Sequence, residues 1–509
     1  MNCWIDMFKN IMEEQWFKID KFTLFGRFFL PSAIKNPFYR FCLLTIIQIK
    51  YIIQAFMMGK QYRTLTIWII PALCVHMTLS CASKPGVFRE IDNAVWQADF
   101  TAAVDAITAG QRGNETIYSP GNAVSLYLDK GFLEHYAGNH EASSGDLQYA
   151  ERLIEEAYTK SVTESFFSYI LNDNTKEYPG EDFEDIYINV FNALNYYNRG
   201  SLEGALVEIR KLSMSSGKLD MLARKYEYTD PNTGAGLNDM VQKESGVSQL
   251  PETKAVNFSN SALARYLGAL FYQGAGNTDA ARIEFEQVYR AFSTNNNIYR
   301  HGVPKAVQAA RDVPPEKARL NIISFAGLSP IKEEARIAHF LPFRHPVLMI
   351  AVFKLPVLTR RPSMITRIEV IVDGTNRFDL ELLEDMNAVI EETFNARYSN
   401  ILLKTYIRTI LKYAAADIAA METIRRQGEL AGFLVAAAAR TAMEISESAD
   451  TRMSRYLPGR AYIGGINLDP GTYSVIINYY NGNSIAGTEY RDVTVNRNGL
   501  NLLESVNLK

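Results

Sequence analysis

The sequence predicts an α+β protein, with an irregular array of helical repeats in the N-terminal half and a mixed α/β part that ends in a small antiparallel β-sheet. Two observations predict this class: a motif recurs four times between positions 99 and 281, and short β-branched or alternating segments follow Pro314-Pro315. The chain of 509 residues is 47% hydrophobic and 12% aromatic, which suits several buried cores. A net charge of −3 without a basic stripe excludes a nucleic-acid footprint.

Residues 57–80 have the pattern of a secretion signal. Lys60 and Arg63 precede an apolar run over 65–79, and Ser80 and Cys81 follow it. A basic segment, a short apolar segment and a small residue in this order predict cleavage between Ser80 and Cys81. A cysteine at that position is the residue that carries the diacylglyceryl group of a bacterial lipoprotein, so we expect a lipid anchor on Cys81.

Cysteine usage agrees with this expectation. The four cysteines are Cys3, Cys42, Cys74 and Cys81, and none follows Cys81. An exported chain that begins at Cys81 has no partner for a disulfide and no cysteine cluster for a metal. Thr78 departs from the leucine usual in this signal. The alternative is a short membrane anchor with an incidental cysteine, although the run is shorter than the ~20 residues of a span.

Residues 1–56 are unusual because a signal peptide begins a chain. One interpretation is a start assigned too far upstream, with Met57 or Met58 as the true first residue. The other is a membrane helix over 41–58, which Gln48 and Lys50 disfavour because charged and polar groups are costly at a bilayer centre.

The recurring motif is a turn or polar residue followed by small ones, at 99–103, 139–143, 201–205 and 277–281. A glycine precedes each of the last three copies, and a small residue stands seven or eight positions before that glycine. An apolar residue lies four positions after the last small residue of each copy. Small residues let two antiparallel helices approach, and glycine ends the first helix in a left-handed cap. This is the skeleton of a tetratricopeptide repeat, predicted over 81–313. The residues expected to pack at the crossings are Gly131, Gly138, Ala193, Gly200, Ala205, Gly268 and Ala281.

The copies lie 40, 62 and 76 residues apart, so we expect an irregular array with long loops at 172–180 and 228–260. Segments 131–138, 150–158, 171–174 and 193–208, together with Ala449-Asp450-Thr451-Arg452 and Leu457-Pro458, resemble a family of uncharacterised bacterial lipoproteins with tetratricopeptide-like repeats. The resemblance spans most of the mature chain. It implies an architecture and an envelope location, and it carries no established activity.

The second half predicts strands and helices in turn. Apolar or β-branched runs at 347–353 and 368–372 predict two strands, and apolar residues at three- and four-residue steps predict helices within 380–446. Alternation at 473–477 and 491–495, with turns at 469–471 and Asn481-Gly482, predicts the small antiparallel sheet. We therefore expect a strand-plus-helix domain over 314–460 and an antiparallel β domain over 461–509.

Catalytic and metal-binding patterns are missing from the sequence. It contains no HExxH, GxSxG or phosphate-binding loop, and Gly274-Ala275-Gly276 suits a turn between helices better than a dinucleotide site. His339 and His345 have no cysteine or carboxylate cluster beside them, so no metal or cofactor is predicted.

Two further pairs of polar residues have structural interpretations. His135 and His140 stand five apart, off a common helical face. Asp450 and Arg452 could in principle do acid–base work, but the interpretation we favour is an ion pair or a helix-end cap.

These features predict a lipid-anchored, exported bacterial envelope protein without enzymatic activity. Its partners would be the membrane, through the anchor, and a protein or extended peptide bound by the repeats. Envelope or peptidoglycan assembly is suggested by analogy with other repeat-bearing lipoproteins. Ala82 is not an acidic retention signal, which favours the outer membrane over the cell membrane. The alternative is an envelope enzyme or glycan-processing protein with a site in the C-terminal half, near His339 or His345.

Overall fold

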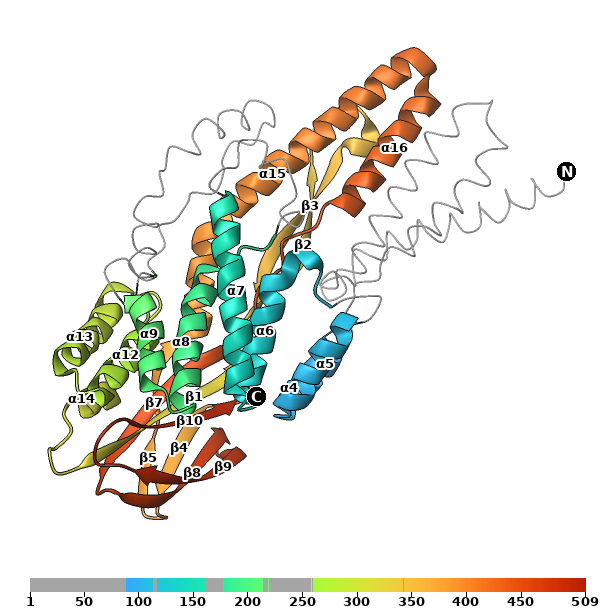
Figure 1. The fold of residues 1–509 in the computed structure, drawn as a ribbon. Helices are drawn as coiled ribbons and strands as arrows, with labels where there is room; N and C mark the ends of the chain where they lie inside the picture. Colours follow the sequence, from blue (N-terminus) through green and yellow to red (C-terminus); the bar gives the residue numbers. More distant parts are fainter. Residues whose placement is uncertain are drawn as a thin grey trace, which may run out of the picture. The chain divides into compact units, whose positions relative to one another are not determined.

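Helical hairpins make up the first part of the described chain, and strands with one long helical hairpin make up the rest (Figure 1). The computed structural model describes residues 88–112, 117–161, 177–213, 218, 258, 260–341 and 343–509, all within the unit Pro85–Lys509. Residues 1–56, the predicted signal peptide with Ser80 and Cys81, and most of the two predicted long loops lie outside the described residues.

The helices are α4 Arg89–Trp96, α5 Phe100–Arg112, α6 Ala123–Tyr136, α7 His140–Ser161, α8 Asp182–Asn198, α9 Leu202–Ser213, α12 Ala262–Gly274, α13 Thr278–Thr294, α14 Lys305–Arg311, α15 Met386–Gln427 and α16 Glu429–Ser446. Two short 3-10 helices are η2 Pro120–Asn122, directly before α6, and η5 Pro346–Leu348. The strands are β1 Ala318–Leu328, β2 Ile331–Phe340, β3 Ile350–Thr359, β4 Arg367–Val372, β5 Asn376–Asp379, β6 Glu381–Asp385, β7 Pro458–Leu468, β8 Gly471–Asn481, β9 Ser484–Val495 and β10 Asn501–Asn507. The mixed helix and sheet content confirms the α+β class.

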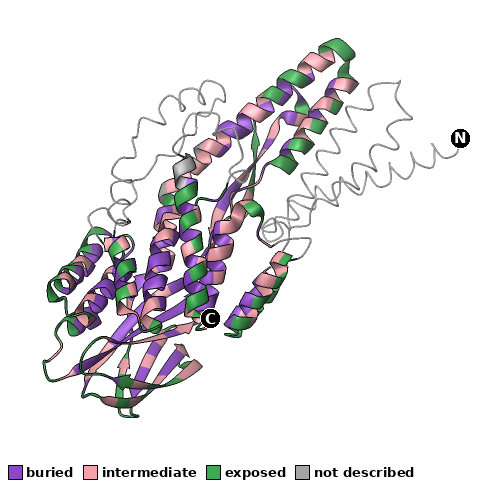
Figure 2. Ribbon diagram, in the orientation of Figure 1, coloured by how far each residue is buried: buried purple, intermediate pink, exposed green. Residues whose placement is uncertain are grey.

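Two four-stranded sheets lie face to face. The central sheet has the order β10-β1-β7-β6, and the outer sheet has the order β5-β4-β8-β9. Strand β1 shows how the layers are built, because it is buried along almost its whole length (Figure 2). Its Ile323 and Phe325 pack with the helical hairpins, whereas Leu320 and Ile322 pack with the outer sheet. The central sheet is therefore the middle layer between helices and a second sheet.

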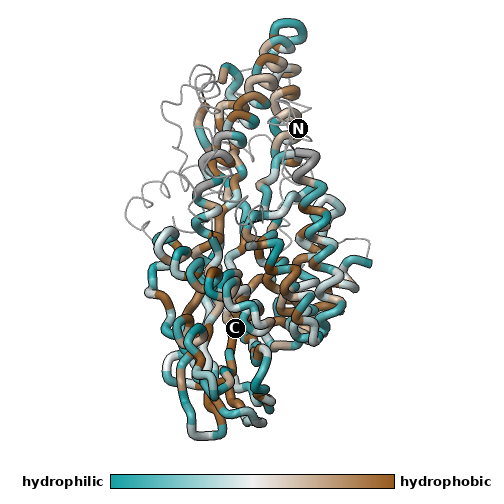
Figure 3. The backbone as a smooth tube through the Cα atoms, turned by 60° about the vertical axis from the view of Figure 1, so that its left-hand side comes forward, coloured by the Kyte–Doolittle hydropathy of each residue, from teal (hydrophilic) through white to brown (hydrophobic). Residues whose placement is uncertain are grey.

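A long hairpin and a two-stranded ribbon form a separate region, which we call the arm. It consists of β2 and β3 with residues 401–446 of α15 and α16, and it has its own core around Leu348, Phe353, Ile410, Tyr413 and Ala436. In Figure 3 hydrophobic segments follow this hairpin nearly to its hydrophilic tip. Among the described residues no helix is long and apolar enough to cross a membrane.

The strand predicted at 368–372 is confirmed as part of β4, and the alternating segments fall in β8 and β9. The strand predicted at 347–353 is right only from Ile350, where β3 begins, because residues 347 and 348 lie in η5. The helical prediction over 380–446 is right from Met386 onward, but residues 381–385 form β6. No sequence pattern predicts strands β1, β2 and β5, and β10 lies within the β region predicted over 461–509.

The predicted independent sheet over 461–509 needs correction. The boundary at 460 falls inside β7, which pairs with β1 and β6, and β8 pairs with β4 as well as β9. Strand β10 runs parallel to β1, far away in sequence. The local hairpin signal was correct, because Asn481 and Gly482 join β8 to β9. The other edge of β8 pairs with β4, a partner that local alternation cannot indicate, while β9 is the edge strand of the outer sheet.

Candidate functional site

Four helical hairpins share one turn geometry. The pairs are α4–α5, α6–α7, α8–α9 and α12–α13, and the residues Ala98, Gly138, Gly200 and Gly276 between them all have a left-handed backbone, with φ of 60°, 81°, 78° and 75°. In each turn the next amide donates to the carbonyl five residues earlier: Asp99 to Ala94, Asn139 to Glu134, Ser201 to Tyr196 and Asn277 to Tyr272. This is the Schellman cap, which satisfies the last carbonyls of the first helix.

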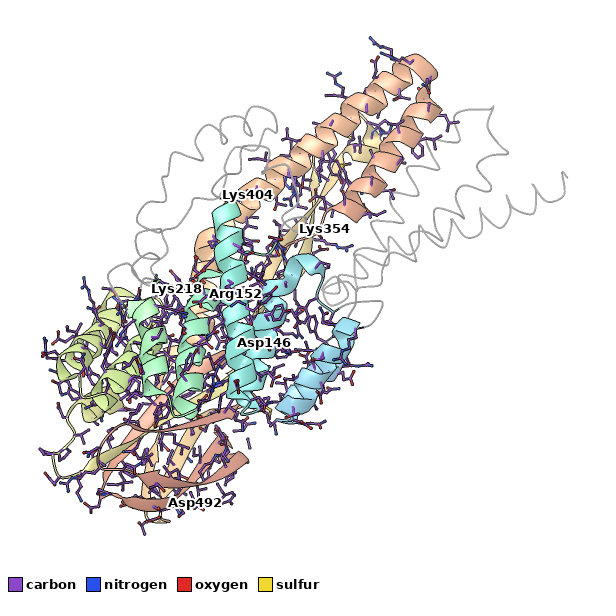
Figure 4. The ribbon with its side chains drawn as sticks, in the orientation of Figure 1. Asp146, Arg152, Lys218, Lys354, Lys404 and Asp492 are labelled. Atoms are coloured by element: carbon purple, nitrogen blue, oxygen red, sulfur yellow. The ribbon has the colours of Figure 1, made fainter. Side chains whose placement is uncertain are left out.

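Of the residues predicted to pack at the crossings, Gly131 faces the paired helix and Gly268 faces α9 of the preceding hairpin, whereas Gly138 and Gly200 lie in the turns with nothing within 4 Å of a Cβ. A Cβ at Gly131 would stand 2.7 Å from the side chain of Leu147, and one at Gly268 would stand 3.1 Å from Ile209. Ala193, Ala205 and Ala281 are all buried. Between hairpins, Lys218 joins Glu151 of α7 and Asp185 of α8, each at 2.6 Å (Figure 4).

The first helices of the hairpins hold the C-terminal half of the same chain. Phe191 of α8 packs on Phe325 of β1, with ring centroids 5.0 Å apart. The Tyr197 hydroxyl donates to the Leu500 carbonyl at 2.8 Å and accepts from the Leu502 amide at 3.0 Å. These helix faces therefore already bind the extended strand β10.

Two histidines that the sequence placed on different faces lie together. His135 lies in the last turn of α6 and His140 begins α7, and the tight turn between them brings their ring centroids to 5.4 Å in an edge-on arrangement. Nδ1 of each approaches Oδ1 of Asn195, at 2.6 Å for His135 and 3.1 Å for His140. Nε2 of His135 contacts Glu504 of β10 at 2.5 Å.

Burial opposes protonation of both histidines, with different outcomes. For His135 the nearby Glu504 carboxylate outweighs burial and raises the pKa. For His140 burial and the neighbouring His135 lower the pKa. Within the described ranges no three His, Cys, Asp or Glu side chains form a metal-binding group. His135 links α6 to β10 through Glu504, and both histidines contact Asn195 of α8.

A second attachment, which we call the clamp, consists of Asp129 and Glu184 with the backbone of residues 454–456. Oδ1 of Asp129 accepts from the amides of Arg455 and Tyr456, at 2.6 and 3.2 Å. Oε1 of Glu184 accepts from the Ser454 amide at 2.5 Å. Tyr118 and Tyr178 donate to the other oxygens of the two carboxylates, at 2.6 and 2.8 Å. Both carboxylates are buried, so α6 and α8 hold the segment that leads from the arm into β7.

The clamp lies in a densely charged region. Burial raises the pKa of Asp129 to about 6, and burial together with the neighbouring Glu181 raises the pKa of Glu184 to about 7. The surrounding charges are paired with one another. Glu181 binds Lys332 and Arg397, Asp450 binds Arg452, and Asp92 binds Arg455.

Glu384 of β6 forms a third buried attachment. Its carboxylate accepts from the hydroxyls of Tyr187, Ser261 and Tyr299, at 2.7, 2.9 and 2.6 Å, and from the Leu263 amide at 3.1 Å. The donors come from α8, from α12 with its cap, and from the segment after α13. One carboxylate thus ties two hairpins to the edge of the central sheet.

The sequence motifs above do not include these carboxylates, although the sequence contains one indication of them. Asp129 and Glu184 interrupt apolar helix faces, and an ionisable group at a core position requires specific partners. The partners, however, lie hundreds of residues away in sequence.

The arm carries exposed apolar side chains on both of its helices and on β2. On α16, Leu434 is 47% and Ile445 is 77% exposed, and Ala438, Thr441 and Ala442 between them are also exposed. Ile418 of α15 is 70% exposed and Phe340 of β2 is 62% exposed. The arm therefore exposes several large apolar side chains.

The remaining predicted residues lie in several different places. Asp450 and Arg452 form the predicted ion pair, with Nε to Oδ1 at 2.8 Å. His345 is buried at the start of η5, where its amide donates to Asp417 at 2.7 Å, and His339 is exposed on β2. Gly274-Ala275-Gly276 forms the turn between α12 and α13, as expected.

Comparisons with protein families, with curated proteins and with solved structures find no match for this chain.

Proposed function

We propose that this is a lipid-anchored bacterial envelope protein that acts as a scaffold for another protein. Its anchor is Cys81, its hairpins form a tetratricopeptide-like array, and its partner binds the arm. The repeated Schellman turns support the array, because the left-handed residue and the five-residue backbone bond recur in all four hairpins.

The inner face of the array is an unsuitable site for a partner. The first helices of three hairpins bury their side chains against the central sheet, and Tyr197 and His135 hold β10. A second peptide would have to displace strands of the same chain. The proposed partner therefore uses a surface that these contacts leave open.

The observation that carries the proposal is the outward stripe of α16. Ala431, Leu434, Ala438, Thr441 and Ile445 follow one another at steps of three, four, three and four residues. This spacing places them on one face over about four turns. The stripe has no charged member, and exposed contiguous apolar surface marks protein interaction sites. Its helical spacing suits a partner that packs a helix or groove against it.

The test compares two charged substitutions at equally exposed positions. Leu434→Asp changes the stripe, and Val207→Asp changes α9, where the side chain is 45% exposed. Photo-cross-linking from α16 in living cells, followed by mass spectrometry, would identify adducts. We expect Leu434→Asp to remove a specific adduct that Val207→Asp retains. Equal adduct patterns in both variants would refute the arm as the binding surface.

The anchor has its own test. Cells fed a radioactive fatty acid should label the wild-type protein, and Cys81→Ala should abolish the label. Equal labelling of both proteins, or labelling of neither, would contradict lipidation of Cys81.

A further inference from the structure

The first described helix carries an exposed tryptophan on its outward side. Ile91 and Val95 of α4 are buried in a core shared with α5, whereas Arg89, Asn93 and Trp96 are exposed. At roughly 100° per residue, these three lie within about 60° of one another round the helix. Trp96 is 53% exposed.

The acidic residues of α4 leave this face without an unpaired carboxylate. Asp92, which also lies on this side of α4, is bound by the Arg455 guanidinium at 2.6 Å and by the Tyr456 hydroxyl at 3.0 Å. Glu90 lies roughly 120° round the helix from Trp96. The face therefore offers one guanidinium, one amide and one indole, without an unpaired acid between them.

Covalent geometry limits the distance between this face and the anchor. Phe88 is fixed to the body, with its ring 4.8 Å from the Arg455 guanidinium and 5.6 Å from the Tyr118 ring. Seven peptide units separate Phe88 from Cys81, and they span about 25 Å at most. Trp96 lies eight residues further along, about 12 Å by helical rise. An acyl chain on Cys81 would hold Trp96 within roughly 40 Å of the bilayer.

We infer that the outward face of α4 rests on the lipid bilayer, with Trp96 in the headgroup region and Arg89 facing lipid phosphates. This inference rests on the proposed anchoring of Cys81. Tryptophan concentrates at membrane interfaces because its ring is largely apolar while its N–H stays hydrogen-bonded. A guanidinium binds phosphate oxygens in pairs. Tethering raises the effective concentration of the face at the bilayer, so even weak affinity suffices for contact.

The sequence allows the fluorescence of the processed protein to be assigned to one tryptophan. Trp96 is the only tryptophan after Cys81, because the others are Trp4, Trp16 and Trp68. The processed protein, isolated from bacterial membranes and checked by intact mass for acylation, would be placed in phosphatidylethanolamine–phosphatidylglycerol vesicles. Fluorescence would be compared between ordinary vesicles and vesicles with brominated acyl chains. Trp96→Phe is the control that assigns the emission.

We expect a blue shift in ordinary vesicles and loss of emission in brominated ones, with both signals lost in Trp96→Phe. An acylated protein whose emission is unchanged by bromine and stays open to aqueous acrylamide would overturn the membrane contact and leave the proposed anchor intact. A mass without acylation would overturn both. Arg89→Glu should reduce the bromine quenching if the phosphate contact is correct, and unchanged quenching would remove Arg89 from the contact.

Discussion

The helical hairpins and the arm are attached to the rest of the protein by different contacts. Buried carboxylates of the hairpins and of β6 and β10 bind donors across the junction. The arm is joined to the hairpins by the ion pair of Lys332 with Glu181. Its own ribbon and helices are held together by an apolar core, by the buried pair of Arg408 with Glu447 at 3.0 Å, and by Lys354, which donates to the carbonyls of Glu444 and Glu447 at 2.8 and 2.7 Å (Figure 4). Satisfied buried polar groups define one arrangement, whereas the exposed stripe of α16 can accept a partner.

The largest expected effect is the loss of a clamp carboxylate. Asp129→Ala would leave two amides and two hydroxyls without their acceptor in a buried place, and each unsatisfied group costs about 1–3 kcal/mol. We expect the free energy of unfolding to fall by about 3 kcal/mol or more in urea denaturation.

Glu422→Ala is the matched change in the arm. Its carboxylate makes only exposed pairs with Arg425 and Arg426, so we expect a loss below about 1 kcal/mol. Equal losses in the two variants would show that the clamp and the arm do not differ as described.

The clamp also predicts a pH dependence. Because Asp129 and Glu184 have pKa values raised to about 6 and about 7, the folded state binds more protons than the unfolded state between about pH 4 and 7. The free energy of unfolding should therefore fall as the pH rises from 5 to 8. His135, whose pKa is also raised, acts in the same direction.

Glu184→Gln isolates the contribution of one group. A pKa raised by two to three units corresponds to a few kcal/mol of stability. In Glu184→Gln the fall in the free energy of unfolding between pH 5 and 8 should therefore be smaller by about 1–3 kcal/mol. The measurement is urea denaturation at each pH, and a slope identical to wild type would contradict the burial of an ionisable Glu184.

Packing at a hairpin crossing gives the next effect. Gly131→Ala would place a methyl group 2.7 Å from Leu147, and overpacking of this kind costs about 1–3 kcal/mol. Gly145→Ala in the facing helix α7 meets nothing within 4 Å and should stabilise by up to about 1 kcal/mol. Thermal unfolding of both variants would separate close approach from helix propensity, and a stabilised Gly131→Ala would refute the crossing.

The smallest effect concerns the turns. Ala98 adopts the left-handed conformation that glycine adopts in the other three hairpins. Ala98→Gly should raise the free energy of unfolding by about 0.5–1 kcal/mol, and Gly138→Ala should lower it by about 1 kcal/mol. Changes of the same sign in the free energy of unfolding of the two variants would show that the two turns do not share one backbone conformation.

The sequence predicts these hairpins better than the sheets for a physical reason. The residues that form a helix-helix turn or crossing lie close together in sequence. Glycine and small residues at fixed spacing therefore predict the roles of Gly131, Gly138 and Gly268. Strand β1 is buried on both faces and so lacks the alternation that marks a half-buried strand. Its parallel partner β10 is about 180 residues away, and no local pattern encodes that pairing.

The candidate site was harder to predict than the fold. His135 and His140 are off a common face of one helix, and only the turn between two helices brings them together. Asp129 and Glu184 carry a signal as charges at core positions, but their acceptor role depends on backbone amides of residues 454–456. The exposed stripe of α16 is visible in the sequence only as an alanine-rich helix.

Native-state hydrogen exchange tests the contrast between the two attachments most directly. We predict that the amides of residues 454–456 exchange only with global unfolding, while amides of α16 exchange earlier through local opening. Amides of α16 that exchange as slowly as those of residues 454–456 would contradict it.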